Sequence, residues 1–142
     1  MSAAPPRGFL DTNVLVYWLQ DSERAKTVDT LLAQQCVISV QVLNELANVM
    51  RKKSPMTWAE VATMSQTLLK ACELSDVTYP VHQLAVTLAE RYQFKIYDAN
   101  ILAAAALMRC EVVYSEDMQH GMSIQIPPQF GGNSLSIKNP FL

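Results

Sequence analysis

Four acidic residues, spread widely along the chain, have the type and the position that a metal-assisted reaction requires. They are Asp11, Glu45, Asp98 and Asp117. Asp11 directly follows the apolar run Gly8-Phe9-Leu10, and Asp117 follows another such run over residues 112–115. Ligand sites in open α/β sheets form beyond the carboxyl ends of the strands, so acids at strand ends are candidates for chemistry.

The other two acids lie on predicted helices. Successive helical residues rotate by about 100°, which puts Glu45 next to Val49 at the border of the apolar face of a helix over residues 41–51. A carboxylate at such a border is costly unless it is paired or bound to a metal. Asp98 opens a helical stretch over residues 98–109 and projects on the same face as Ile101 and Leu102, toward the core.

Each acid also has an ordinary structural interpretation. Asp11 and Asp98 suit the start of a helix, as N-cap and first-turn residues. Glu45 can pack its stem while its head reaches water, and Asp117 can belong to a solvated turn. No single acid decides between the two interpretations. The functional hypothesis rests on four acids at comparable positions, which converge if the sheet is parallel and doubly wound.

Converging carboxylates repel one another, and a divalent cation removes that repulsion. A ligand set of oxygens without histidine or thiolate favours Mg²⁺ or Mn²⁺ over Zn²⁺. Such a site activates water, orients a phosphodiester and stabilises the developing charge, with two metals about 4 Å apart in its strongest form.

The elements that position these acids are predicted to alternate between strand and helix, which indicates βαβ units around a parallel sheet. We expect a three-layer α/β/α fold with a central, mostly parallel sheet, and one domain over residues 1–142. Strands are predicted at residues 9–10, 37–39, 77–79 and 112–114, with an edge strand after residue 134. Helices are predicted at residues 23–34, 41–51, 57–72, 81–92 and 98–109.

The helix that begins near Thr57 has the clearest local signal. Thr57 as N-cap and Glu60 three residues later form a capping box. Its apolar positions, expected to be buried, are Trp58, Val61, Ala62, Leu68, Leu69 and Cys72. With the preceding helix it forms a hairpin around residues 53–55.

Three consecutive cations end the helix that carries Glu45. They are Arg51, Lys52 and Lys53. Positive charge is favoured at a helix C-terminus, so a solvated last turn is one interpretation. The other is contact with nucleic-acid phosphates.

Composition sets the broad class. The chain has 142 residues, half of them hydrophobic, and a formal net charge of −2. This charge argues against a generally basic nucleic-acid-binding surface, but neutralising four metal-bound carboxylates would leave the remainder near +2. Cys36, Cys72 and Cys110 are expected to be buried, reduced thiols. The N-terminal apolar stretch suits neither a signal peptide nor a membrane span, so a cytoplasmic protein is expected.

With these residues assembled, the sequence resembles the PIN-domain ribonuclease family, particularly the toxins of bacterial VapB–VapC toxin–antitoxin systems. The similarity covers nearly the whole chain. Four segments resemble the four acidic motifs of the family: residues 9–13 (FLDTN), 39–46, 97–105 (YDANILAAA) and 115–117 (SED). The first and third are fairly specific as a pair.

The resemblance implies that Asp11, Glu45, Asp98 and Asp117 hold one or two Mg²⁺ or Mn²⁺ ions, with Asn13 and Ser115 orienting them. It implies metal-assisted hydrolysis of RNA, a homodimer, and silencing by a small antitoxin protein that inserts a basic segment into the acidic groove. Because Glu116 adjoins Asp117, either of these two acids is a candidate for the fourth ligand.

Two other hypotheses remain open. Haloacid-dehalogenase-like phosphatases also have an Asp after their first strand, but they need a second acid two residues later, where this chain has Asn13. The second is a catalytically silent PIN-like module that binds RNA or a protein partner. The sequence does not identify the RNA target, since such specificity has no readable code.

Overall fold

The structure, a computed structural model, describes residues 4–20 and 22–142. Across these residues it contains one six-stranded sheet in the order β3-β2-β1-β4-β6-β5. The strands are β1 (Gly8–Leu10), β2 (Cys36–Ser39), β3 (Cys72–Ser75), β4 (Val112–Tyr114), β5 (Ser123–Gln125) and β6 (Ser134–Lys138). All neighbouring strands are parallel except β5, which runs antiparallel to β6.

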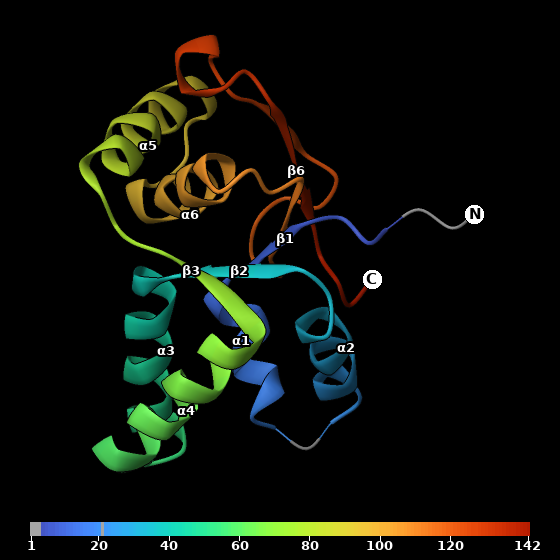
Figure 1. The fold of residues 1–142 in the computed structure, drawn as a ribbon, viewed down its shortest axis with the longest axis vertical. Coiled ribbons are helices and arrows are strands. Elements are labelled where there is room, and N and C mark those ends of the chain that lie inside the picture. Colours follow the sequence, from blue (N-terminus) through green and yellow to red (C-terminus); the bar gives the residue numbers. More distant parts are fainter. Residues whose placement is uncertain (1–3, 21) are drawn as a thin grey trace.

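Helices cover both faces of this sheet (Figure 1). On one side lie α1 (Thr12–Trp18), α2 (Glu23–Leu32), α3 (Val40–Lys53) and α4 (Trp58–Ala71). On the other side lie α5 (Tyr79–Tyr92) and α6 (Ile96–Leu107), and a 3-10 turn, η1 (Pro128–Phe130), precedes β6. The prediction of a three-layer α/β/α fold is therefore confirmed. The strand predicted after residue 134 is β6, but its edge position was wrong, because β6 pairs with β4 on one side and with β5 on the other. No helix in the described part of the chain is long and apolar enough to cross a membrane.

The core explains why the central strands read as continuous apolar runs. Phe9 and Leu10 of β1 and Val37 and Ile38 of β2 are all completely buried, because helices cover both faces of the sheet. On α6 the run of small residues Ala103–Ala106 is buried as well. Small side chains let this helix lie close to both the sheet and α5.

The strand predicted at residues 77–79 was wrong. The strand is β3, which follows α4 directly, whereas Val77 lies in the next connection and is 51% exposed. The helix α5 begins at Tyr79 because the Thr78 side chain accepts a hydrogen bond from the Val81 backbone N–H and Pro80 suits the first turn. The β-branched residue Thr78 therefore caps a helix and does not belong to a strand.

The capping box at Thr57 and Glu60 is confirmed, but part of the expected buried face of α4 was wrong. The buried residues are Val61, Met64 and Leu68, while Trp58 is 66% exposed and Leu69 43% exposed. Ala62 is exposed as well, and Cys72 is buried as the first residue of β3. The Trp58 ring instead lies under the Arg51 guanidinium, 4.4 Å from the ring centroid.

Candidate active site

One pocket of about 470 Å³ gathers the four predicted acids. Asp11 follows β1 as the N-cap of α1, and Glu45 lies on the second turn of α3. Asp98 lies in the first turn of α6, and Asp117 lies in the loop after β4. The four acids therefore come from four separate elements and meet beyond the carboxyl ends of β1, β2 and β4.

Asp11 is the most buried of these acids, with only 7% of its surface exposed. Its Oδ1 accepts a hydrogen bond from the Thr12 backbone N–H at 2.8 Å, and its Oδ2 accepts one from the Ser115 hydroxyl at 2.9 Å. Burial raises the pKa of Asp11 to about 6, although these two hydrogen bonds oppose the rise. Repulsion from Glu45 and Asp98 adds to it.

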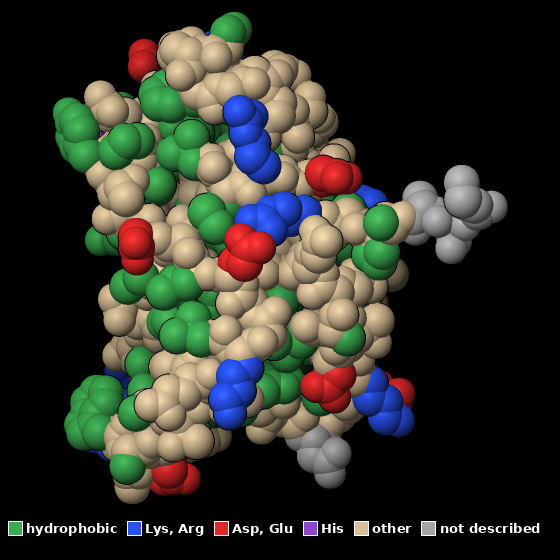
Figure 2. Space-filling view, viewed as in Figure 1, with side chains coloured by type: hydrophobic (Ala, Val, Ile, Leu, Met, Phe, Trp, Pro, Cys, Tyr) green, Lys and Arg blue, Asp and Glu red, His purple; other side chains and the backbone are tan. Residues whose placement is uncertain are grey.

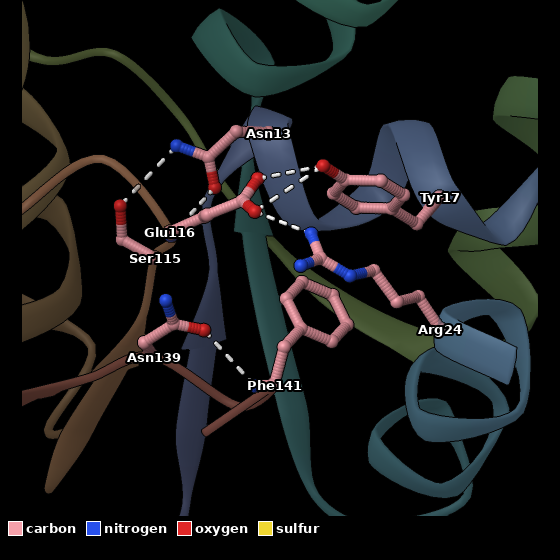
Figure 3. Close-up of polar contacts among 7 residues, drawn as sticks. All are labelled: Asn13, Tyr17, Arg24, Ser115, Glu116, Asn139 and Phe141. Atoms are coloured by element: carbon pink, nitrogen blue, oxygen red, sulfur yellow. Dashed lines mark hydrogen bonds and ion pairs between the residues drawn. The ribbon is translucent and has the colours of Figure 1, made fainter.

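Asn13 ties the end of β1 to the end of β4. Its amide nitrogen donates to Asp11 Oδ2 and to the Ser115 hydroxyl, both at 3.3 Å. Its amide oxygen accepts from the backbone N–H of Glu116 at 3.0 Å, a contact visible in Figure 3. The Ser115 hydroxyl also accepts from the Met118 backbone N–H. Asn13 and Ser115 thus fix the direction of the Asp11 carboxylate.

Two polar residues that the sequence did not single out hold Glu45. The Thr12 hydroxyl donates to Glu45 Oε2, and the Gln41 side-chain amide donates to Oε1, each at 2.9 Å. Gln41 precedes Glu45 by four residues on α3, a spacing at which helical side chains meet. The spacing between Gln41 and Glu45 was therefore a sequence signal for their contact. The contact between Thr12 and Glu45 joins α1 to α3, and no local sequence pattern predicts it.

Asp98 is half-buried and faces two other acids across the pocket. Burial is the main cause that raises the pKa of Asp98, and the nearby Lys95 opposes it. The negative charges of Asp117 and Glu45 raise it further. Asp98 therefore lies within electrostatic reach of acids from α3 and from the loop after β4.

The structure distinguishes the neighbours Glu116 and Asp117. The Glu116 carboxylate is ion-paired with Arg24 and accepts a hydrogen bond from the Tyr17 hydroxyl at 2.9 Å (Figure 3). The Arg24 guanidinium lies over the rings of Tyr17 and Phe141, at 4.7 and 4.8 Å from their centroids. Within the described residues, Asp117 has no side-chain hydrogen bond or salt bridge, and it is exposed in the pocket. This arrangement favours Asp117 over Glu116 as the fourth acid of the site.

The three cations at the end of α3 have different surroundings. Arg51 stacks on Trp58 and donates to the Met56 carbonyl at 2.7 Å. Lys52 is exposed and lies outside the pocket lining, whereas Lys53 lines the pocket. Of the three, Lys53 has the position expected for a ligand contact.

A metal ion is the group that the donor set of this pocket fits. Within residues 4–20 and 22–142, no three Asp, Glu, His or Cys side chains already stand close enough together to hold a metal ion. The Glu45 carboxylate is held by hydrogen bonds from Thr12 and Gln41. The carboxylates offer only oxygen ligands, and Asp11 is a buried acid without a paired cation in this part of the chain. Both features suit a hard divalent cation.

Comparison with known proteins was consistent with this geometry. The family model described as PIN domain matches residues 8–120. No curated protein sequence matches the chain significantly.

Solved structures of toxin–antitoxin proteins share the fold. A toxin–antitoxin complex from Klebsiella pneumoniae is 23% identical, with a TM-score of 0.63, over 78% of this chain and 86% of that one. VapC20 of Mycobacterium tuberculosis, described as a sarcin–ricin loop cleaving toxin, is 20% identical with a TM-score of 0.63, over 78% and 89%. DNA-bound VapBC from Salmonella typhimurium is 18% identical with a TM-score of 0.63, over 96% and 99%. At these identities the similarity shows the fold alone.

Proposed function

The chain belongs to the PIN-domain family, and on that premise we propose that it is a metal-dependent ribonuclease that hydrolyses RNA phosphodiester bonds. The observation that carries the proposal is the meeting of four carboxylates from four elements in one pocket. Asp11 supports this proposal, because a buried acid with a raised pKa next to other acids destabilises the fold unless a cation compensates its charge.

Asp11, Glu45, Asp98 and Asp117 would hold one or two Mg²⁺ or Mn²⁺ ions. When bound, such an ion lowers the pKa of a water molecule and neutralises charge on the phosphate. Neighbouring residues orient these carboxylates by hydrogen bonds. Ser115 and Asn13 hold the Asp11 carboxylate, and Thr12 and Gln41 hold the Glu45 carboxylate. In this proposal the exposed Asp117 and half-buried Asp98 complete the acidic end of the pocket.

We further propose that the protein is the toxin of a toxin–antitoxin pair in the cytoplasm, acting as a homodimer. Its support is that several proteins of this fold were crystallised in VapBC or other toxin–antitoxin complexes. An acidic pocket is also a suitable receptor for a basic segment of an antitoxin protein. The match to the PIN family favours a nuclease over the phosphatase hypothesis.

A silent PIN-like module that binds RNA or protein is the second candidate. The PIN-domain match is compatible with this candidate as well, because retained carboxylates do not guarantee turnover. It predicts binding of metal and RNA without turnover.

The test is cleavage of RNA by the purified protein in Mg²⁺ or Mn²⁺. We expect EDTA to abolish cleavage, renewed metal to restore it, and Asp98→Asn to abolish it, because this change removes one of the four negative charges with little change in shape. Equal degradation by wild type and Asp98→Asn would overturn the proposal. Metal and RNA binding without cleavage would establish the silent module.

A further inference from the structure

The pocket continues beyond its acids along the facing sides of α1 and α3. Asn13, Val16 and Gln20 recur at helical spacing on α1 and just beyond its end, and Glu45, Val49 and Lys53 do so on α3. With a rise of about 1.5 Å per residue, the eight residues from Glu45 to Lys53 span about 12 Å. The pocket is thus an elongated groove with acids at one end and an ammonium group at the other.

The walls of this groove have the chemistry of a nucleotide site. Val16 from α1 and Val49 from α3 are half-buried apolar side chains, which suit the faces of a base. Asn48, exposed next to them, carries an amide without a hydrogen-bond partner among the described residues, which suits a base edge. Among the described residues that line this groove, Lys53 is the one cation, and its ammonium group can bind a phosphate.

From this juxtaposition we propose that the α1–α3 part of the pocket binds a nucleotide of single-stranded RNA adjacent to the bond that is cleaved. Lys53 holds a backbone phosphate, and Asn48 contacts the base. This inference rests on the proposed ribonuclease function. A single strand is required because a base must leave its stack to enter between the two helices. On the face of the molecule in Figure 2, charges of both signs are interspersed.

The test uses matched neighbours on α3, in the cleavage-deficient Asp98→Asn background with Mg²⁺. Binding of a labelled single-stranded oligonucleotide is measured by fluorescence anisotropy at several salt concentrations. Lys53→Ala should weaken binding about tenfold and reduce the slope of log K against log salt by about 0.7, the loss of one phosphate contact. Lys52→Ala, next to it but outside the pocket, should change neither. Asn48→Ala should change the preference among homopolymer sequences, and Asn44→Ala, exposed on the same helix, should not.

Equal effects of Lys53→Ala and Lys52→Ala, with wild-type RNA cleavage intact, would overturn the subsite alone. Absence of both cleavage by wild type and binding by Asp98→Asn would overturn the ribonuclease function and the subsite with it.

A second, independent observation concerns two cysteines far from this pocket. Cys36 begins β2 and Cys72 begins β3, and the two residues are direct partners in the parallel register. Their Sγ atoms lie 2.7 Å apart. Both thiols are free and both residues are buried, with 4% and 6% of their surfaces exposed, and both residues line a surface pocket together with Lys70 and Glu73.

We infer that Cys36 and Cys72 form a disulfide under mild oxidation. A disulfide needs Sγ atoms about 2.05 Å apart, so the thiols must approach by less than 1 Å. With hydrogen peroxide, the Cys36 thiolate attacks one oxygen to give a sulfenic acid and hydroxide. The Cys72 thiol then attacks that sulfur, and its proton leaves with the displaced hydroxide as water; in total two thiols and one peroxide give one disulfide and two waters. The link closes a loop over residues 36–72, which contains the α3–α4 hairpin and Glu45.

Peptide mapping of the folded protein after peroxide treatment tests this inference. We expect a Cys36–Cys72 cross-link, with Cys110 left as a free thiol. Cys110→Ser should leave the cross-link in place, and Cys36→Ser should abolish it. The oxidised protein should unfold at higher urea concentration, because the closed loop restricts the unfolded chain. Failure to cross-link under peroxide that oxidises a small thiol such as glutathione, or a link through Cys110, would overturn it.

Discussion

Asp11 holds a charge in surroundings that disfavour it. Its carboxylate is buried, its pKa is raised to about 6, and two other acids repel it. In the unfolded chain the same group titrates near 3.9. Between these values the folded state binds more protons than the unfolded state, so this group lowers stability as pH rises from about 4 to 6, and the loss persists at higher pH.

Replacement of Asp11 by Asn should therefore stabilise the metal-free protein at neutral pH. We expect a gain of up to about 3 kcal/mol in the free energy of unfolding near pH 8, since each pKa unit corresponds to about 1.4 kcal/mol. The gain should shrink near pH 4.5. Urea unfolding in EDTA at both pH values measures it. A difference that is independent of pH, or a loss of stability at both pH values, would contradict the burial argument.

Asp117 and Glu116 should respond differently to loss of charge. Asp117→Asn removes a carboxylate that has no side-chain partner in residues 4–20 and 22–142, and we expect RNA cleavage to fall roughly 100-fold or more. Glu116→Gln keeps a side chain that Tyr17 and Arg24 can contact, and we expect a smaller fall, of about tenfold. Cleavage rates of the two variants at saturating Mg²⁺ decide the matter. The reverse order would make Glu116 the fourth acid.

Among the helices and strands, local sequence patterns correctly predicted the features that contacts between near neighbours in the chain determine. The capping box placed the start of α4, and the apolar period of α3 placed Glu45 correctly at a half-buried border. The strand after α4 was misplaced because it follows the helix without a loop, while Thr78 caps the next helix. The contacts of Glu116 with Tyr17 and Arg24 join residues more than 90 positions apart, and no local pattern encodes them.

The capping box of α4 supports the hairpin without belonging to the site. Thr57→Ala removes the side-chain acceptor of the Glu60 backbone N–H and should lower the free energy of unfolding by about 1 kcal/mol. RNA cleavage per folded molecule should stay unchanged. Thr63→Ala, exposed on the same helix, is the control and should have a smaller effect. Urea unfolding of the three proteins checks this, and equal stability of wild type and Thr57→Ala would contradict it.

For the whole molecule, strand order brings the acids together. From β1 the chain proceeds to β2 and β3 on one side, and later to β4 on the other. Acids that follow β1, β2 and β4 therefore meet at the point where the strand order reverses, which is where open α/β sheets bind ligands. Periodicity in the sequence indicated strands and helices but not their order, so convergence was a hypothesis until the topology was known. One domain over residues 1–142 remains a prediction.

The central claim is that these four acids form one metal-dependent centre that cleaves RNA. Its most direct test is the cleavage rate, with Mg²⁺ and with EDTA, of wild type and of Asp11→Asn, Glu45→Gln, Asp98→Asn and Asp117→Asn, beside the exposed control Glu111→Gln. We predict Mg²⁺-dependent cleavage by wild type and by the control, and a loss of roughly 100-fold or more in each of the four variants. Cleavage that persists in EDTA, or four variants as active as the control, would contradict the account.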